Sequence, residues 1–126
     1  MNLRKPDPEY VKAAHEEFPL AEQEAPISAK DLNSEFHEDW DAADQKWKYK
    51  RVTVTGTVRY KGPDIHSVPS FELSDSTEGT CEVLACLAGE EEYGDIQVGD
   101  IIVVQGNYLI ESDTYGVCLK MSKTII

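Results

Sequence analysis

The feature that most constrains the fold is a run of alternating apolar and polar residues that begins near residue 49. The apolar side chains of this run share one parity, namely Val52, Val54, Val58 and Tyr60. A period of two is the pattern of a strand with one buried face. Gly56 interrupts the run, and a glycine inside a strand predicts a bulge or a bend.

Four further strand-like runs follow, separated by turn signals. They cover Ser70–Ser74, Thr80–Leu87, Ile101–Tyr108 and Tyr115–Met121. A longer polar segment, residues 88–98, separates the third run from the fourth, and its glutamates at 90–92 suit the start of a short helix. Five strands with a glycine in the long first one and an insertion after the third predict an OB-fold barrel, so the protein is expected to be mainly β.

An amphipathic helix is predicted before the barrel. Its apolar residues recur three or four positions apart: Leu32, Phe36, Trp40, Ala43 and Trp47. Ser28 and Asp31 form a near capping box at its start. The pattern predicts a leading helix over residues 28–48 that packs against a barrel of residues 49–126, as a single domain, 28–126.

The first 27 residues are predicted to form a short helix and a linker. Asp7 before Pro8 is typical of a helix start, so we expect a helix from there to about Phe18. Pro19 ends it. Residues 19–26 are polar and proline-flanked, which predicts a solvated linker.

Charge limits the choice of partner. The chain carries 12 Lys and Arg against 24 Asp and Glu, a net charge of −12. Such a charge repels polyphosphate, whereas nucleic-acid binders present a basic field. Nucleic acid is therefore disfavoured as a partner, although it stays the main alternative.

No apolar run reaches the length of a membrane span or follows the amino terminus as in a signal peptide. We therefore expect a cytoplasmic protein without membrane contact. The three cysteines, Cys81, Cys86 and Cys118, are expected to be reduced thiols in the core.

The sequence contains no set of residues that predicts catalysis. The segment His37–Asp41 approaches the helical zinc-protease pattern, but Asp41 stands where the second histidine belongs. Neither a nucleophile elbow nor a Gly-rich phosphate loop is present. We expect a protein that is not an enzyme and that uses no cofactor or metal.

Three strand segments carry a family resemblance: Tyr49–Val58, Phe71–Ser74 and Val98–Gly106. Together with the helix start at Ile27–Ala29, they resemble the bacterial OB-fold family called tRNA_anti-like over about residues 27–123. The resemblance implies an OB barrel with a nucleic-acid-binding label but no defined substrate. Many members look like envelope lipoproteins, whereas this sequence shows no leader and no lipid-acceptor cysteine near its start.

In the nucleic-acid alternative, a basic cluster around Lys48 and Arg51, extended by Arg59 and Lys61, contacts phosphate. OB-folds stack bases on the outer face of their second and third strands. If Phe71, Leu73, Cys81 and Val83 point inward, Ser70, Ser74, Glu72 and Glu82 face outward there. The two glutamates would oppose phosphate on this face.

In a third alternative, the barrel loops bind an oligosaccharide or a small ligand through His66, Asp113 and Tyr115. Together the alternatives define one set of candidate ligand contacts: Lys48, Arg51, Arg59, Lys61, His66, Glu72, Glu82, Asp113 and Tyr115.

The favoured function is a non-enzymatic binding module for a protein or peptide. Residues 101–104 are apolar at both parities, and Leu84 and Cys86 fall at outward positions, so these side chains need cover. In one interpretation the Leu32–Trp47 stripe covers them. In the other a second subunit shares this task, which makes the protein a homodimer.

Overall fold

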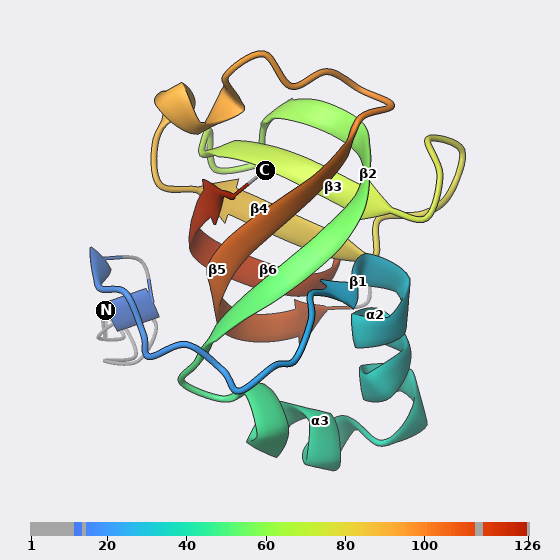
Figure 1. Ribbon diagram of the computed structural model, residues 1–126, viewed down its shortest axis with the longest axis vertical. Helices are drawn as coiled ribbons and strands as arrows, with labels where there is room; N and C mark the ends of the chain where they lie inside the picture. Colours follow the sequence, from blue (N-terminus) through green and yellow to red (C-terminus); the bar gives the residue numbers. More distant parts are fainter. Residues whose placement is uncertain (1–11, 14, 113–114, 126) are drawn as a thin grey trace, which may run out of the picture.

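Five long strands close a barrel in the computed structural model, which describes residues 12–13, 15–112 and 115–125 (Figure 1). The strands are β2 (Arg51–Pro63), β3 (Pro69–Ser74), β4 (Val83–Leu87), β5 (Ile101–Ser112) and β6 (Gly116–Thr124). They follow the order β2-β3-β4-β6-β5, and a further pairing of β2 with β5 closes the sheet. Only β4 and β6 run parallel within the barrel. The predicted mainly β, five-stranded barrel is confirmed.

The long first strand, β2, serves two neighbours. Residues 51–57 pair with β5, and residues 57–63 pair with β3. Val52, Val54 and Val58 are fully buried in the core, as the alternation predicts. Tyr60 is exposed, because a bulge between Val58 and Tyr60 shifts the register. The prediction that Tyr60 shares the buried face is therefore wrong.

Of the two features predicted for Gly56, a bulge or a bend, the bulge does not form, because Gly56 stays in register with Ile102 of β5. Because it has no side chain, Gly56 instead permits neighbouring residues to approach the backbone of β2 closely. A Cβ at this position would lie 3.1 Å from the Cβ of Leu73 and 3.2 Å from the Cβ of Ala29. The glycine lets β3 and the first helix pack tightly against β2.

Two helices, α2 (Ala29–Glu38) and α3 (Trp40–Trp47), replace the predicted single helix over residues 28–48. Asp39 separates them in an extended conformation with φ −155°. Its side chain accepts a hydrogen bond of 3.1 Å from the N–H of Ala42. Aspartate is a strong N-cap, so it starts a second helix where apolar periodicity alone suggests continuation.

The helices α2 and α3 lie at one end of the barrel (Figure 1). Four residues of the apolar stripe are buried in the barrel core: Leu32, Phe36, Ala43 and Trp47. Trp40, which follows the break, is 44% exposed, and its indole N–H donates to Glu111. Tyr108 of β5 ties the helices to the sheet, because its ring lies 5.4 Å from Phe36 and its hydroxyl donates to Asp44.

The segment before α2 lies along β2. Leu20 bridges to Arg51, and β1 (Ile27–Ser28) pairs in parallel with residues 54–55. The Gln23 amide exchanges hydrogen bonds of 2.9 and 3.0 Å with the backbone of Thr53. The segment thus covers the β2 edge that β3 does not reach, which differs from the predicted solvated linker. The predicted helix start at Asp7 lies outside the described residues.

Side-chain directions on β3 and β4 differ in part from the prediction. Ser70 keeps the predicted outward direction, because it pairs with Cys86 of a second apolar cluster outside the barrel core, although both Ser70 and Ser74 are buried. Their hydroxyls donate to the Val68 carbonyl and to the Asp75 carboxylate. Cys81 lies in a second apolar cluster rather than in the barrel core. The predicted inward parity fails for Cys81 because β4 begins only at Val83.

The predicted helical turn forms as the 3-10 helix η1 (Glu90–Tyr93) at the other end of the barrel (Figure 1). Tyr93 packs edge-on against Phe71 at 5.4 Å, and its hydroxyl accepts a hydrogen bond from the N–H of Ser70. Of the helices in the described part of the chain, none is both long and apolar enough to span a membrane.

Candidate functional site

Arg51, the centre of the predicted basic cluster, is buried and only 4% exposed. Its guanidinium donates to the Asn107 side chain at 2.9 Å and to the carbonyls of Gln105 and Met121 at 2.9 and 3.0 Å. Burial lowers the pKa of this guanidinium, and the Glu17 carboxylate opposes that effect. The structure therefore places Arg51 inside the fold and not on a ligand-facing surface.

Asn107 connects Arg51 to the amino-terminal segment. Its amide oxygen accepts from the N–H of Phe18 at 3.0 Å as well as from Arg51. Its amide nitrogen donates to the carbonyls of Ala13 and Glu16. We call this pair the Arg51–Asn107 hub. Every polar atom of the Asn107 amide has a partner, which is what burial of an amide requires.

Arg59 and Glu72 form an ion pair with each other, so two predicted site residues neutralise one another. The ammonium of Lys61 donates to the carbonyl of Ile96 at 2.9 Å. Lys48 is exposed beside the ring of Tyr49 at 5.2 Å. These predicted cations do not converge on one surface.

Glu82 lies between the barrel and α2, where its carboxylate accepts a hydrogen bond from the Asn33 amide. Asn33 is buried and its amide oxygen has no partner among the described residues. Glu82 is thus engaged by a helix that caps the barrel.

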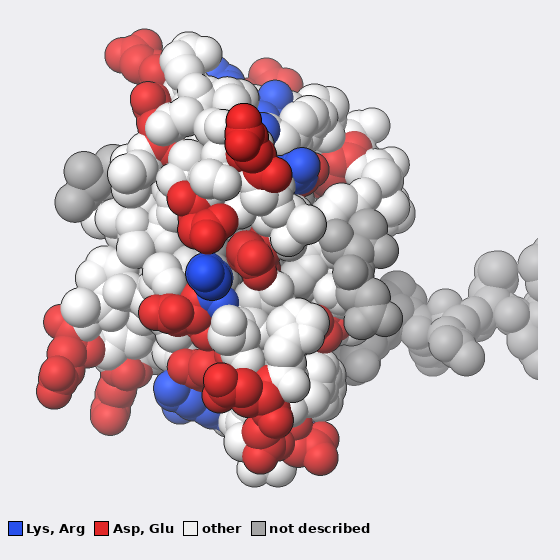
Figure 2. Space-filling model, turned by 90° about the vertical axis from the view of Figure 1, so that its right-hand side faces the viewer, with Lys and Arg blue, Asp and Glu red and all other residues white. Residues whose placement is uncertain are grey.

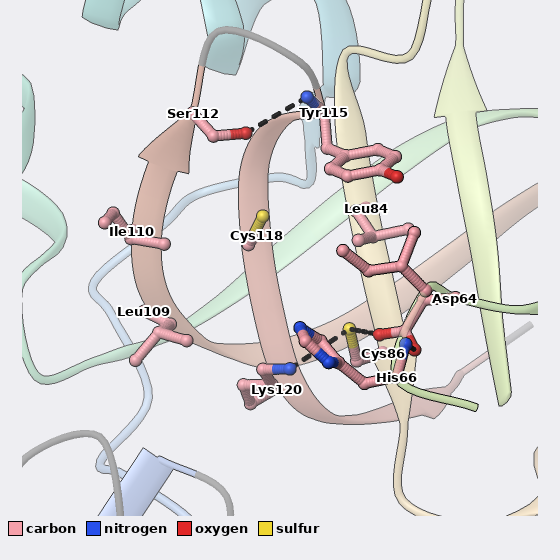
Figure 3. Close-up of a pocket in the computed structure, with 11 residues that line it drawn as sticks. Asp64, His66, Leu84, Cys86, Leu109, Ile110, Ser112, Tyr115, Cys118 and Lys120 are labelled. Carbon is pink, nitrogen blue, oxygen red and sulfur yellow. Dashed lines mark hydrogen bonds between the residues drawn. The ribbon is translucent and has the colours of Figure 1, made fainter. Parts of the chain in front are cut away.

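The structure brings His66 and Tyr115 together at a pocket on the outside of the barrel (Figure 3). The pocket has a volume of about 200 Å³. The loop 64–68, between β2 and β3, forms one wall, while β4, β5 and β6 supply the rest. The lining residues are Asp64, Ile65, His66, Leu84, Cys86, Leu109, Ile110, Ser112, Tyr115, Cys118 and Lys120. Asp113, the third predicted loop contact, lies outside the described residues.

The pocket is mainly apolar. Leu84, Cys86 and Cys118 are buried and belong with Cys81 to the second apolar cluster. Ile65 and Ile110 stand at the rim and are 74% and 50% exposed. We call the outer side of β4 and β6, with these two rim residues, the pocket face.

The helix stripe does not cover the pocket face. Its buried residues pack into the barrel core with the inward side chains of β4 and β6, such as Val83 and Leu119. The prediction that the stripe covers Leu84 and Cys86 is therefore wrong. The cause is strand geometry, because alternate residues of β4 point to opposite sides of the sheet.

Polar groups lie at both ends of the pocket (Figure 3). At one end, the Sγ of Cys86 lies 3.6 Å from the Lys120 ammonium and 3.7 Å from Oδ2 of Asp64. At the other end, the N–H of Tyr115 donates to the Ser112 hydroxyl at 3.0 Å. A ligand in this pocket would meet an apolar middle between two polar ends.

The pocket thiols are held in the neutral form. Burial raises the pKa of the Cys118 thiol to about 11, with a smaller contribution from Cys86. Burial also raises the pKa of Cys86, and the Lys120 ammonium opposes the shift. Near pH 7 both thiols therefore act as apolar surface, since the thiolate is the nucleophile and the metal ligand.

Asp64 organises the loop that forms the pocket wall. Its Oδ1 accepts hydrogen bonds from the N–H groups of His66 and Val68 at 2.8 and 2.9 Å. The Asp64 N–H in turn donates to the carbonyl of Val68 at 2.8 Å. Ile65 and His66 are thus presented from a closed, hydrogen-bonded turn, an arrangement that Asp favours.

Acidic residues outnumber basic ones among the charged residues of the chain. Figure 2 shows more Asp and Glu than Lys and Arg on one face of the molecule. At the pocket itself, the Asp64 carboxylate and the Lys120 ammonium both lie beside the Cys86 thiol. Across the described residues, no group of three His, Cys, Asp or Glu side chains is arranged to hold a metal ion.

Sequence reasoning named two of the lining residues as ligand contacts and missed the others. Part of the pocket can be predicted from the sequence, because Leu84 and Cys86 are expected to be apolar and to point outward. What the strand pattern does not show is that Leu109, Ile110 and the loop 64–68 stand beside them.

Among solved structures, the chain is similar to a crystal structure described as that of a "putative nucleic acid-binding lipoprotein" from Klebsiella pneumoniae subsp. pneumoniae. The two chains are 14% identical, with a TM-score of 0.61 over 97% of this chain and 100% of the other. This likeness shows a shared fold. No curated protein matches the chain.

The tRNA_anti-like family matches residues 4–123. This range includes both helices and all five barrel strands except Thr124, the last residue of β6. The protein therefore belongs to the tRNA_anti-like family.

Proposed function

We propose that the protein is a non-enzymatic binding module that takes up an apolar side chain of a protein or peptide in the pocket on its pocket face. The observation that carries the proposal is the apolar pocket between the loop 64–68 and β5, which no other described segment covers. OB-folds commonly bind ligands on this side, with the loops that follow their first and fourth strands.

The volume of the pocket favours a single side chain of a partner, rather than a whole cofactor, as its ligand. Pockets for drug-sized ligands usually hold roughly 300–1,000 Å³. The present pocket is smaller, at about 200 Å³. It therefore suits one anchoring group of a larger partner, and the exposed Ile65 and Ile110 would contact the partner on either side.

The test is selection from a displayed library of random peptides. Wild-type protein and the Ile110→Glu variant are used as separate targets, because a carboxylate at the rim opposes an apolar ligand. Ile101→Glu is the matched control, since Ile101 is also an exposed isoleucine of β5 but lies outside the pocket. We expect peptides enriched on wild type and on Ile101→Glu, but not on Ile110→Glu. Equal enrichment on all three proteins would contradict the proposed site.

A single-stranded nucleic acid is the second candidate. His66 lies beside Lys120 at one end of the pocket and Tyr115 lies at the other end, and stacking on such rings is how OB-folds hold bases. The membership in the tRNA_anti-like family and the description of the Klebsiella protein point the same way. An anisotropy titration with labelled DNA and RNA at about 50 and 200 mM salt tests it, since phosphate contacts weaken steeply over that range.

Location and assembly belong to the same proposal. We infer a cytoplasmic protein from the sequence alone, and a second copy of the chain is one protein partner that the pocket face could receive. Light scattering of wild type and Ile110→Glu at high concentration separates self-association from binding to another protein.

A further inference from the structure

We infer that the chain covers its own pocket: Tyr10, within residues 1–11, occupies the space between the loop 64–68 and β5, and a partner binds by displacing it. These eleven residues precede the described part of the chain. This assignment rests on the proposed function, because it gives the same pocket the same kind of ligand, an apolar side chain, and adds how access to the pocket is regulated.

The described chain begins beside the pocket. Asn107 of β5 donates hydrogen bonds to the carbonyls of Ala13 and Glu16. The register partner of Asn107 on β6 is Lys120, which lines the pocket. Figure 3 agrees with this placement, because the blue amino-terminal segment lies on the Lys120 side of the pocket. Residues 1–11 are therefore joined to the fold at the edge of the pocket.

Tyr10 is close enough in sequence to reach the middle of the pocket. It stands three residues before Ala13, a separation that an extended chain spans in about 10 Å. The pocket residues Leu109 and Ile110 follow Asn107 by two and three positions on β5, which is about 7–10 Å along the strand. Ala13 is 1% exposed, and positions i and i+3 of a helix share a face. A helix that continues upstream therefore also turns Tyr10 to the side that Ala13 buries.

The chemistry of the pocket suits a tyrosine. Apolar side chains such as Leu84 and Ile110 form its middle, and polar groups stand at both ends (Figure 3). A phenol combines an apolar ring with a polar hydroxyl, so the ring can cover the apolar middle while the hydroxyl meets a polar end. Val11, the neighbour of Tyr10, is apolar but has no polar group to place there.

The covalent link to the fold favours this occupant over a weak external ligand. A binding group on a short linker has an effective concentration in the millimolar range, on the order of 1 mM. The apparent affinity of an external partner falls by the fraction of the protein whose pocket is free. A partner therefore displaces Tyr10 only if it binds more tightly, for example by also engaging the exposed rim residues Ile65 and Ile110.

The first experiment measures the cover of the pocket by thiol modification in the full chain. Cys118 lines the pocket, whereas Cys81 belongs to the same apolar cluster but does not line it. Wild type, Tyr10→Ala and Tyr10→Phe are treated with iodoacetamide, and mass spectrometry gives the rate at each cysteine. We expect Tyr10→Ala to raise the rate at Cys118 about three- to tenfold and to leave Cys81 unchanged. Tyr10→Phe, which keeps the ring, should react like wild type.

The second experiment measures competition for the pocket. Peptides are selected on wild type and on Tyr10→Ala, and those that fail to bind Ile110→Glu are kept. By fluorescence anisotropy, such a peptide should bind Tyr10→Ala about three- to tenfold more tightly than wild type, because the pocket of the variant is free. Its affinity for Tyr10→Phe should equal that for wild type.

The outcomes separate the two proposals. Equal rates at Cys118 in wild type and Tyr10→Ala overturn the cover by Tyr10, and so does a faster reaction of Cys118 and Cys81 alike, because the whole fold would then have loosened. A peptide that depends on Ile110 but binds wild type and Tyr10→Ala equally also overturns it and leaves the proposed function standing. If no peptide depends on Ile110 on either target, the proposed function falls, whereas a raised rate at Cys118 alone still supports Tyr10 as the occupant.

Discussion

The outer face formed by β2 and β5 differs from the pocket face in what covers it. The first carries Arg51 and Asn107, and the amino-terminal segment covers both through paired hydrogen bonds. The second carries Leu84, Cys86 and Cys118 around an open pocket. Polar residues on the covered face serve the fold, whereas apolar residues on the open face are available for a partner. From residue type alone, one would expect the apolar residues to serve the fold and the polar residues to be available for a partner.

The largest effect should come from the covered face. Asn107→Ala removes one of the three hydrogen bonds of the Arg51 guanidinium and takes the Asn107 partner from the Phe18 N–H and from the carbonyls of Ala13 and Glu16. Because each unpaired buried polar group is costly, we expect unfolding free energy to fall by about 3–5 kcal/mol in urea titrations. Gln97→Ala, at an exposed position, should change it by less than about 0.5 kcal/mol. A loss below 1 kcal/mol for Asn107→Ala would show that the hub is not structural.

The next effect is a loss of stability at high pH. The Cys118 thiol has a pKa raised from the model-compound value of about 9 to about 11 by burial. Between these values the unfolded chain has lost the proton and the folded chain retains it, so stability is full below pH 9 and falls as pH rises toward 11. The fall is at most about 3 kcal/mol for this group. Burial raises the pKa of Cys81 and Tyr108 too, which adds in the same direction.

Urea titrations of wild type and Cys118→Ala at pH 8, 9, 10 and 11 measure this contribution. The variant should lose less stability over the range than wild type does. Parallel pH profiles for the two proteins would mean that the Cys118 thiol is more accessible to water than its burial indicates.

A third prediction compares the two apolar clusters. Leu84→Ala on the pocket face should cost about 2 kcal/mol, because its neighbours border an open pocket and can relax into the space. Leu73→Ala, in the closed barrel core, should cost about 3–5 kcal/mol. Thermal or urea unfolding of both variants measures the difference. Equal losses would show that the pocket face is packed as tightly as the core.

The smallest effect on stability should come from the pocket rim. Ile110→Glu places a charge on a half-exposed side chain, so the unfolding free energy should stay within about 0.5 kcal/mol of wild type. Binding of a selected peptide should nevertheless be lost. A variant that loses stability as well would mean that Ile110 supports the barrel and does not serve only a partner.

The strand pattern could be predicted because its signal is local. Val52, Val54 and Val58 are buried as expected, and the segment after residue 88 contains the expected helical turn. The predictions from apolar periodicity are wrong where a capping side chain or a bulge interrupts the regular element. Asp39 capped a new helix, and the bulge after Val58 turned Tyr60 toward solvent.

The candidate site was only partly predictable. The sequence predicts His66 and Tyr115 as loop contacts, and the structure places both at the pocket. Arg51 was named as a phosphate contact, yet the structure buries it. Its charge is evident from sequence, but its burial depends on Asn107, which is 56 positions away.

The sequence by itself determined the mainly β barrel, its family and the acidic charge, because alternation, glycine spacing and composition are written in neighbouring residues. Only the tertiary structure decided which charged side chains face a partner. The pocket is assembled from residues 64–66, from 84 and 86, and from 109, 110, 112, 115, 118 and 120, which meet because the sheet closes and β4 pairs with β6. Closure brings distant segments together and fixes what each side chain touches, and no local pattern encodes that.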